Sequence, residues 1–336
     1  MYHPYALAST AHRAWTIYVK GCKKLPERTI SVGNWTWGGT GKTPLCEWLA
    51  HRLGVESSVI LTRGYRGGDE ASMLAEFGCQ VGVGKSRYTT GLEMWNQDKA
   101  KRIRYWILDD GLQHWALVRD VEIITVDCLL PFGINGRLIP CGSLRERPEL
   151  ALRRAHIVVL HNADLVDAHR LEDLDNFVRS NVTQNVAVVH SIAKVDYTGV
   201  GMKHSQASEI RIASSENATA RCDENHGWIL FSGLGNNNAF FTKMNTIARA
   251  NGVTVLNTFG FPDHHVFTAN DIKLFREAGE SQGRKITYLT TAKDMARCSW
   301  LADAEILGAR AVRSTWEPLH PFDRDFALFE RIIFGL

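Results

Sequence analysis

Short apolar runs alternate with longer stretches of mixed polarity along the first half of the chain. These runs are rich in Val, Ile and Leu, and they lie at residues 29–32, 59–62, 105–108, 121–126, 157–160 and 186–189. Nearly continuous apolar runs separated by helical stretches are typical of strands in a parallel sheet that is covered on both faces. The pattern therefore predicts an α/β fold with a mainly parallel sheet.

The second half of the chain begins with a polar stretch and then repeats this pattern on a smaller scale. Residues 195–226 have little periodicity, whereas apolar runs return at 228–231, 253–256 and 286–290, with a helical stretch at 239–250. The turn at 232–235 invites comparison with a nucleotide-binding loop, but it has no lysine, so a tight strand-to-helix turn is favoured. The predicted organisation is a basic amphipathic segment at 1–27, a first lobe at 28–194, a linker or irregular excursion at 195–226, and a smaller α/β lobe at 227–336.

Length and composition narrow the class of protein. A chain of 336 residues favours two lobes, and 45% hydrophobic with 22% charged residues is typical of a soluble globular protein. The net charge of +3 gives no reason to expect nucleic acid, and no obligate protein partner is evident. The seven cysteines include no C-x-x-C pair, which predicts reduced thiols in an intracellular compartment. No apolar run approaches the length of a membrane-spanning helix.

The first 26 residues are basic and contain no Asp or Glu. Arg13, Lys20, Lys23 and Lys24 are interspersed with apolar residues, among them Trp15. This composition fits an amphipathic helix that rests on an anionic lipid surface, and it also fits part of an organelle-targeting segment. An ordinary first helix docked on the fold is the third interpretation, and the sequence leaves all three open.

A glycine-rich segment between the first apolar run and the next helical stretch carries the strongest chemical signal. It consists of Thr36, Trp37, Gly38, Gly39, Thr40, Gly41, Lys42 and Thr43. Glycines let backbone N–H groups approach phosphates, and the helix N-terminus adds partial positive charge. Lys42 would reach the outer phosphates and Thr43 would hold Mg²⁺. Thr36 stands where the common pattern has glycine, and an ordinary glycine-rich turn is the alternative.

Two adjacent carboxylates, Asp109 and Asp110, end the run at 105–108. Ligands of open α/β sheets gather at the carboxyl ends of the strands, and P-loop enzymes place a Mg²⁺ ligand there. Neighbouring residues on a strand cannot point the same way, so we expect one carboxylate to face the metal and the other to face Lys42 or a water. The alternative is a solvated turn. A GTPase is not indicated, because 291–294 has the wrong order for a guanine-recognition motif and Leu112 replaces the glycine of a switch motif.

Further acidic, basic and guanidinium groups cluster in the connecting segments, where catalytic residues concentrate. They lie at 63–65, 67–70, 113–115, 145–147 and 261–265. Each cluster alone has a structural interpretation, such as a surface ion pair or a satisfied histidine.

Taken together, these motifs resemble the tetraacyldisaccharide 4′-kinase family, which phosphorylates a lipid A precursor with ATP. The resemblance rests on residues 30–34, 36–44, 62–65, 68–70, 109–114, 144–146 and 263–265, and it spans about residues 28–300. It implies a two-lobed P-loop NTPase-type fold with the active site between the lobes. It also implies a lipid disaccharide acceptor and a peripheral position on a membrane. Thr36 is itself a trait of this family.

The resemblance also implies roles for individual residues. Asp69 is expected to be the base for the sugar hydroxyl and His264 its second-lobe partner. The metal ligands implied are Thr43, Asp109, Asp110 and Glu146, and the phosphate-charge stabilisers are Lys42 and Arg145. The residues expected near the acceptor are Asn34, Tyr65, Arg87, Gln113 and His114.

Some details depart from the family pattern without removing a proposed catalytic group. Arg147 delays the proline of the Leu-Arg-Glu-Pro motif to Pro148, and the loop before Asp69 is short. Residues 61–65 and 161–164 resemble plant members, which implies a mitochondrial setting; a bacterial member would lie on the cytoplasmic face of the inner membrane. Two alternatives stay open: a soluble P-loop kinase or ATPase with another hydroxyl substrate, and a non-catalytic nucleotide-binding relative.

Overall fold

The structure, a computed structural model, describes residues 15–16, 19, 21–64, 69–183, 185–196, 226–280 and 285–336. The chain divides into two compact units, Met1–Ala193 with Trp316–Leu336 and Lys194–Thr315. Most of the predicted basic segment and linker lies outside the described residues. None of the described helices is both long and apolar enough to cross a membrane.

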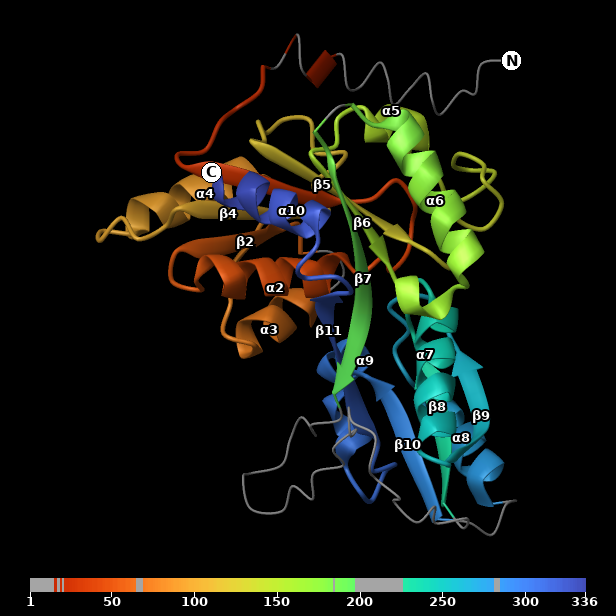
Figure 1. The fold of residues 1–336 in the computed structure, drawn as a ribbon. Helices are drawn as coiled ribbons and strands as arrows, with labels where there is room; N and C mark the ends of the chain where they lie inside the picture. Colours follow the sequence, from red (N-terminus) through yellow and green to blue (C-terminus); the bar gives the residue numbers. More distant parts are fainter. Residues whose placement is uncertain are drawn as a thin grey trace. The chain divides into compact units, whose positions relative to one another are not determined.

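The first unit is built on a parallel sheet (Figure 1). Its strands are β1 (Arg28–Gly33), β2 (Ser58–Thr62), β3 (Gln80–Val83), β4 (Tyr105–Asp109), β5 (Val121–Asp127), β6 (Ile157–His161) and β7 (Ala187–Asp196), which runs across the unit boundary. They lie in the order β3-β2-β4-β1-β5-β6-β7, and every neighbouring pair is parallel. The prediction of an α/β fold with a mainly parallel sheet is confirmed.

Helices cover both faces of this sheet because its buried strands alternate their side chains between the faces. The helices are α2 (Lys42–Leu53), α3 (Asp69–Glu76), α4 (Arg87–Gln97), α5 (Pro148–Leu152), α6 (Ala168–Asn181) and α10 (Arg324–Phe334), with a 3₁₀ turn η3 (Ala163–Leu165). Ile123 of β5 packs in a cluster with α2 and α10, whereas the adjacent Ile124 packs in a cluster with α5 and α6. The near-continuous apolar runs of the sequence follow from this two-sided burial.

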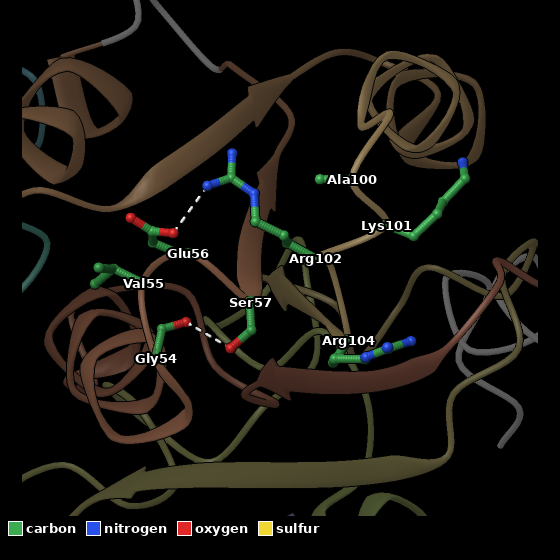
Figure 2. A pocket seen from close by; sticks show the side chains of 8 residues that line it. All are labelled: Gly54, Val55, Glu56, Ser57, Ala100, Lys101, Arg102 and Arg104. Carbon is green, nitrogen blue, oxygen red and sulfur yellow. Dashed lines mark hydrogen bonds and ion pairs between the residues drawn. The ribbon is translucent and has the colours of Figure 1, made fainter.

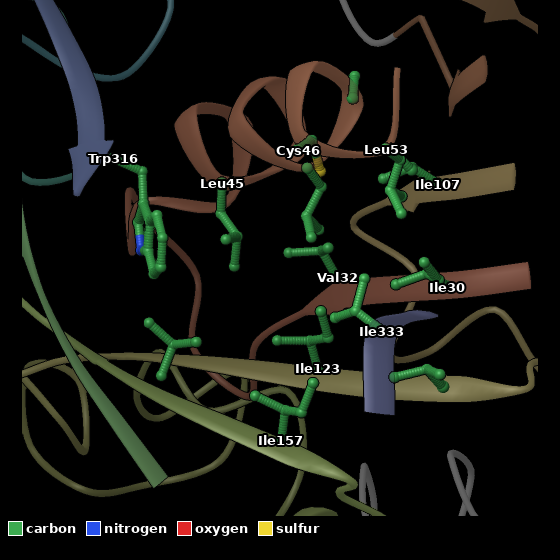
Figure 3. Packing of buried hydrophobic residues seen from close by; sticks show 14 of the residues in the cluster. Ile30, Val32, Leu45, Cys46, Leu53, Ile107, Ile123, Ile157, Trp316 and Ile333 are labelled. Carbon is green, nitrogen blue, oxygen red and sulfur yellow. The ribbon is translucent and has the colours of Figure 1, made fainter. Parts of the chain in front are cut away.

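The C-terminal residues belong to the first unit, which differs from the predicted boundary. The sequence assigned 227–336 to the second lobe, but Trp316–Leu336 returns to the first unit and carries α10 onto α2. Trp48 of α2 contacts Trp316 with 4.6 Å between ring centroids and Phe329 with 5.8 Å. Figure 3 shows Trp316 and Ile333 among the strand and α2 side chains of this core. Burial of these aromatic rings explains the return of the chain.

The second unit contains the parallel strands β8 (His226–Ser232), β9 (Thr254–Gly260), β10 (Lys285–Thr291) and β11 (Arg310–Pro318), in the order β11-β10-β8-β9. Like β7, β11 runs across the unit boundary, because its residues from Trp316 onward belong to the first unit. The helices are α7 (Asn237–Ala250), α8 (Ala269–Glu280), α9 (Ala292–Arg297) and a 3₁₀ turn η4 (Ser299–Ala302). Leu230 of β8 packs in a cluster with α7, and the next residue, Phe231, packs in one with α8 and α9. Alternation along β8 therefore buries both faces of this sheet as well.

Candidate active site

The glycine-rich segment lies where the sequence predicts it, between the end of β1 at Gly33 and the start of α2 at Lys42. Gly41 has a φ of 78°, and a Cβ there would lie 2.5 Å from the ring of His161 at the end of β6. At Gly39, by contrast, an added Cβ would meet nothing within 4 Å among the described residues. The loop is therefore packed from behind at Gly41 and open at Gly39.

The partial positive charge at the N-terminus of α2 is not neutralised by its own first turn. No side chain caps it at Gly41, and its first turn contains no acidic residue. The loop in front of it is held by a hydrogen bond between the hydroxyls of Thr40 and Thr125 (2.7 Å), while the Trp37 N–H donates to the Ser143 carbonyl (2.8 Å). Unsatisfied N–H groups and an unneutralised helix dipole are what a phosphate group requires.

Two cations converge on Asp110 beside this loop. Lys42 Nζ lies 3.8 Å from Asp110 Oδ1, and Arg145 donates to both carboxylate oxygens of Asp110 at 2.9 and 2.7 Å. The Asn34 Oδ1 atom accepts from Lys42 at 3.1 Å and also from Arg145. Asn34 follows β1, Asp110 follows β4, and Arg145 precedes α5. The carboxyl ends of parallel strands lie at the same edge of the sheet, so these residues come together there.

Asp109 and Asp110 have different environments, in line with the expectation from the sequence. Asp110 adopts a φ of 53°, which turns its side chain away from the strand direction of Asp109. Burial disfavours the charge of Asp110, but Lys42 and Arg145 outweigh burial and lower its pKa. Burial, together with the negative charges of Glu70 and Asp110, raises the pKa of Asp109 to about 6.

Two residues not predicted at this position hold Asp109. The Cys46 thiol of α2 donates to Asp109 Oδ1 (3.8 Å), and burial together with the Asp109 charge raises the pKa of that thiol. Arg87 of α4 is buried and donates to the Asp109 backbone carbonyl at 2.6 Å, so its guanidinium fixes the end of β4. A sequence signal for Cys46 did exist, since it lies one helical turn after Lys42 on the same face of α2.

Glu146 does not join the two aspartates. Its oxygens accept from Gln113 at 2.9 Å and from Arg154 at 2.8 Å. No group of three or more His, Cys, Asp or Glu side chains able to hold a metal occurs within the described ranges. Thr43, in the first turn of α2, and the two aspartates that follow β4 remain the candidate ligands, which suits the few protein ligands that Mg²⁺ takes.

His114 is a neutral group in this environment. Its pKa falls to about 4, because burial disfavours the imidazolium and because the cations Arg87, Arg119 and Arg63 add to that effect. His114 is therefore suited to hydrogen bonding and not to binding phosphate as a cation.

The remaining predicted residues lie elsewhere or outside the described part of the chain. His264 belongs to the second unit, at a φ of 62°, next to Arg297 and Asp263. Asp69 begins α3, but its side chain is outside the described residues, as is Tyr65. The pairing of Asp69 with His264 therefore stays a prediction.

A cavity of about 620 Å³ lies away from these residues (Figure 2). It is lined by Ser57 and Arg104, which precede β2 and β4, together with Gly54, Val55, Glu56, Ala100, Lys101 and Arg102. Asp109 ends β4, so this cavity is at the amino ends of the parallel strands. Ligands of open α/β sheets bind at the carboxyl ends, so the cavity is not the candidate active site.

Comparison with known proteins decides the family. A sequence model of the family described as tetraacyldisaccharide-1-P 4′-kinase matches residues 4–321. The chain belongs to this kinase family. It is 32% identical over 317 residues to a probable mitochondrial tetraacyldisaccharide 4′-kinase of Arabidopsis thaliana, which covers 84% of this chain and 74% of the relative. It is 33% identical over 301 residues to the tetraacyldisaccharide 4′-kinase of Halothermothrix orenii, over 81% and 74% of the two chains.

A solved structure of the family gives the same fold. The Aquifex aeolicus LpxK crystal structure, in complex with ATP, matches with a TM-score of 0.58 and 24% identity over 98% of this chain and 96% of that chain. The predicted kinase class and the P-loop-type fold are confirmed by these comparisons.

Buried polar atoms beside the loop are consistent with a ligand-binding role in this kinase family. Gln113 Oε1 and Arg145 Nε are buried without a hydrogen-bond partner in the part of the chain that the structure describes. Buried groups of this kind normally find a protein, water or ligand partner.

Proposed function

We propose that this protein transfers the γ-phosphate of ATP to the 4′-hydroxyl of a tetraacyldisaccharide 1-phosphate. The observation that carries the proposal is the cluster of Lys42, Arg145, Asn34 and Asp110 beside an uncapped helix N-terminus. Phosphoryl transfer needs positioning and charge stabilisation more than covalent chemistry, and this cluster supplies both. The family's name and the ATP bound to the Aquifex relative support the choice of substrates.

The proposed roles follow from the charges of the residues. Lys42 and the N–H groups of the loop bind the outer phosphates, and Arg145 neutralises charge that develops during transfer. Asp110 holds both cations in place through its ion pairs with them. Arg145 and Gln113 both donate to the Asn34 carbonyl, and this common acceptor orients Arg145.

Mg²⁺ is proposed as the cofactor, held by Thr43 and Asp109 with Asp110 close by. Burial, with the negative charges of Glu70 and Asp110 added to it, raises the pKa of Asp109, so a divalent cation at this carboxylate would stabilise its charged form. The ion would supply neutralisation of phosphate charge.

On the acceptor side, Asp69 is proposed to accept the proton of the sugar hydroxyl, with His264 as its partner. Asp69→Asn should abolish turnover while leaving ATP affinity nearly unchanged, because the base contacts the acceptor and not the nucleotide. Equal loss of ATP binding in Asp69→Asn and Lys42→Ala would contradict these roles.

The deciding experiment incubates the purified protein with ATP, Mg²⁺ and tetraacyldisaccharide 1-phosphate and analyses the lipid by mass spectrometry. We expect the mass of one phosphate to be added at the 4′ position. Matched reactions with Lys42→Ala and with a monosaccharide acceptor serve as controls. An unchanged lipid with folded, ATP-binding protein would overturn the proposal, and ATP hydrolysis that does not depend on the lipid would favour a soluble ATPase.

We also propose that the basic N-terminal segment holds the protein on an anionic membrane surface, and that the setting is mitochondrial as in the named Arabidopsis relative. Trp15 and Val19 in this segment are 45% and 69% exposed, which suits contact with lipid. Deleting residues 1–24 should reduce co-sedimentation with cardiolipin-containing vesicles. Undiminished binding would count against this role.

A further inference from the structure

Arg297 at the end of α9 connects a buried carboxylate to the turn that carries His264. Its Nη1 atom donates to Asp294 Oδ1 (3.1 Å) and to the His265 carbonyl (3.0 Å). Its Nη2 atom lies 3.4 Å from His264 Nδ1. The side chains of Arg297 and Asp294 are 7% and 0% exposed, so little solvent competes for these contacts.

Asp294 is a fixed anchor for this arginine. Its Oδ2 atom accepts from the Gly233 N–H at 3.1 Å and from the Thr291 hydroxyl at 2.7 Å, and the Asp294 N–H donates back to that hydroxyl at 3.1 Å. The segment 291–294, which was compared above with a guanine-recognition motif, therefore forms the capped start of α9. A carboxylate with this many donors keeps one position, and so does its arginine.

The backbone of His264 is fixed by the same region. His264 adopts a left-handed φ of 62°, a conformation that non-glycine residues seldom adopt. Its N–H donates to the Gly233 carbonyl at 3.2 Å, and the Gly233 N–H is the group bound by Asp294. One carboxylate thus supports both the main chain and the ring contact of His264.

We propose that Arg297, anchored by Asp294, is a positioning residue that holds His264 as the neutral imidazole with its proton on Nε2. A guanidinium has N–H donors and no acceptor, so His264 Nδ1 must be the acceptor of this contact. Protonation of Nδ1 would place an N–H against the Arg297 cation. The ring proton therefore resides on Nε2, the nitrogen on the side away from Arg297.

Among the described residues, the charged groups with a stated distance to this ring or to its neighbours leave this assignment in place. Asp263 Oδ2 lies 3.7 Å from His264 Nε2, which is too long for a hydrogen bond, and Asp263 Oδ1 is 3.4 Å from Lys293 Nζ. The neighbouring His265 is engaged with Asp271 at 3.1 Å. The Asp263 carboxylate is thus on the Nε2 side of the ring, and its negative charge favours keeping the proton on Nε2 over moving it to Nδ1.

The inference rests on the proposed function and deepens it, because it states what His264 offers to the acceptor chemistry. A ring with its proton on Nε2 presents a hydrogen-bond donor to a carboxylate base and does not compete with that base for the substrate proton. Arg297 acts through this ring and is not itself assigned contact with the substrate.

The first test measures the tautomer directly in the full-length protein and does not depend on kinase activity. The chain has 13 histidines, so ¹⁵N-histidine labelling with His264→Gln as the assignment variant identifies the ring signals. We expect His264 Nε2 to show a protonated, pyrrole-type shift and Nδ1 an unprotonated, pyridine-type shift at neutral pH. Protonation on Nδ1, or an unchanged pattern in Arg297→Ala, would overturn the proposal.

The second test asks whether Arg297 acts through His264. In the lipid kinase assay we expect Arg297→Ala to lower kcat by about 10²-fold, the lower range for general acid–base groups, with the KM for ATP unchanged. Arg297→Lys should recover part of the loss, and Arg276→Ala, which removes an arginine bound to the Glu305 carbonyl, should have no effect. Adding Arg297→Ala to His264→Ala should cause no further loss, whereas additive losses would show a merely structural role. An inactive wild type with the expected tautomer would refute the proposed function and leave the tautomer assignment standing.

Discussion

Each unit contains a glycine-containing turn from a strand into a helix, and the two turns satisfy their helix N-termini in opposite ways. The turn from β1 into α2 places Gly41 before Lys42, with no side-chain cap. In the turn from β8 into α7, the Asn236 side chain accepts from the Ala239 N–H at 3.2 Å. Asn237 accepts from the Leu234 N–H at 3.0 Å and donates to the Phe261 carbonyl at 2.7 Å.

In the second turn the chain's own side chains satisfy the helix N-terminus, whereas the first turn is suited to receive a ligand there. Side chains of the second turn use the donors that a phosphate would need, whereas among the described residues no side chain caps the first turn, so its donors can bind an anion. The buried acids beside the turns differ in the same way. Asp294 accepts from Gly233, Thr291 and Arg297, but Asp109 has negative neighbours and a raised pKa. The presence of a strand, a turn and a helix is therefore a poor indicator of nucleotide binding, and the supply of unused donors is a better one.

The largest expected effect is at Lys42. Lys42→Ala removes the cation that faces the phosphates, so kcat/KM for ATP should fall by about 10³-fold, in the range for a lost charge-stabilising group. Asn237→Ala in the second turn should leave the kinetics unchanged while lowering the melting temperature. Steady-state kinetics at varied ATP checks both, and a comparable kinetic loss in Asn237→Ala would remove the distinction between the turns.

The glycines of the two turns should differ in tolerance. Gly41→Ala combines a left-handed φ with a Cβ 2.5 Å from the His161 ring, and we expect a stability loss of about 2–4 kcal/mol together with lost ATP binding. At Gly233 the added Cβ would lie 3.1 Å from His265 Cβ without a left-handed φ, so Gly233→Ala should cost about 1 kcal/mol. Thermal melts and titration with a non-hydrolysable ATP analogue measure both.

A further variant separates crowding from backbone conformation at Gly41. His161→Ala removes the ring, so it should recover only the crowding part of the Gly41→Ala loss. Full recovery in the double variant would show that the left-handed φ has no role.

The carboxylates of the two regions should respond to amide substitution with opposite signs. The folded-state pKa of Asp109 is about 6 against 3.8 for the ordinary group, so between about pH 4 and 6 the folded protein binds more protons than the unfolded chain. The Asp109 contribution to stability therefore falls as pH rises through this window. Without Mg²⁺, Asp109→Asn should be more stable than the wild type by on the order of 2 kcal/mol at about pH 7.5, and the gain should vanish near about pH 4.

Asp294→Asn is the matched variant in the second unit. It replaces a carboxylate whose neighbours are donors, so it should destabilise the protein at neutral pH by about 1–3 kcal/mol. Melting temperatures across this pH range, with EDTA present, test the pair. Destabilisation by Asp109→Asn at neutral pH would contradict the assigned environment of Asp109.

Local sequence patterns predicted the buried strands and the glycine-rich loop but not the features that depend on distant contacts. The predicted apolar runs lie within β1, β2, β4 to β6, β8 and β10, and they overlap the starts of β7 and β9. In the fully buried strands the run is nearly continuous because both faces of the sheet are covered. The strand β3 was not predicted, since Gln80–Val83 is short and only partly apolar. The return of α10 onto α2 rests on contacts between Trp48 and Trp316, which no local window contains.

The same limit applies to the candidate site. Motif order placed Lys42, Asp109 and Asp110 correctly at one sheet edge, because parallel strands end together. It did not show that Glu146 turns to Arg154 and Gln113, since that choice depends on competing partners in three dimensions. Arg297 was missed for the same reason: its contact with His264 spans 33 residues.

The smallest expected effect is at the cap of α7. Asn236→Ala removes the side-chain acceptor for the Ala239 N–H, so stability should fall by about 1 kcal/mol, a shift of about 2–4 °C in melting temperature. Asn236→Asp keeps an acceptor and should restore the wild-type value. Neither variant should alter ATP affinity, because the second turn satisfies its own donors. A change in ATP affinity without a change in melting temperature would mean that the turn contributes to nucleotide binding, and the contrast between the two turns would then fail.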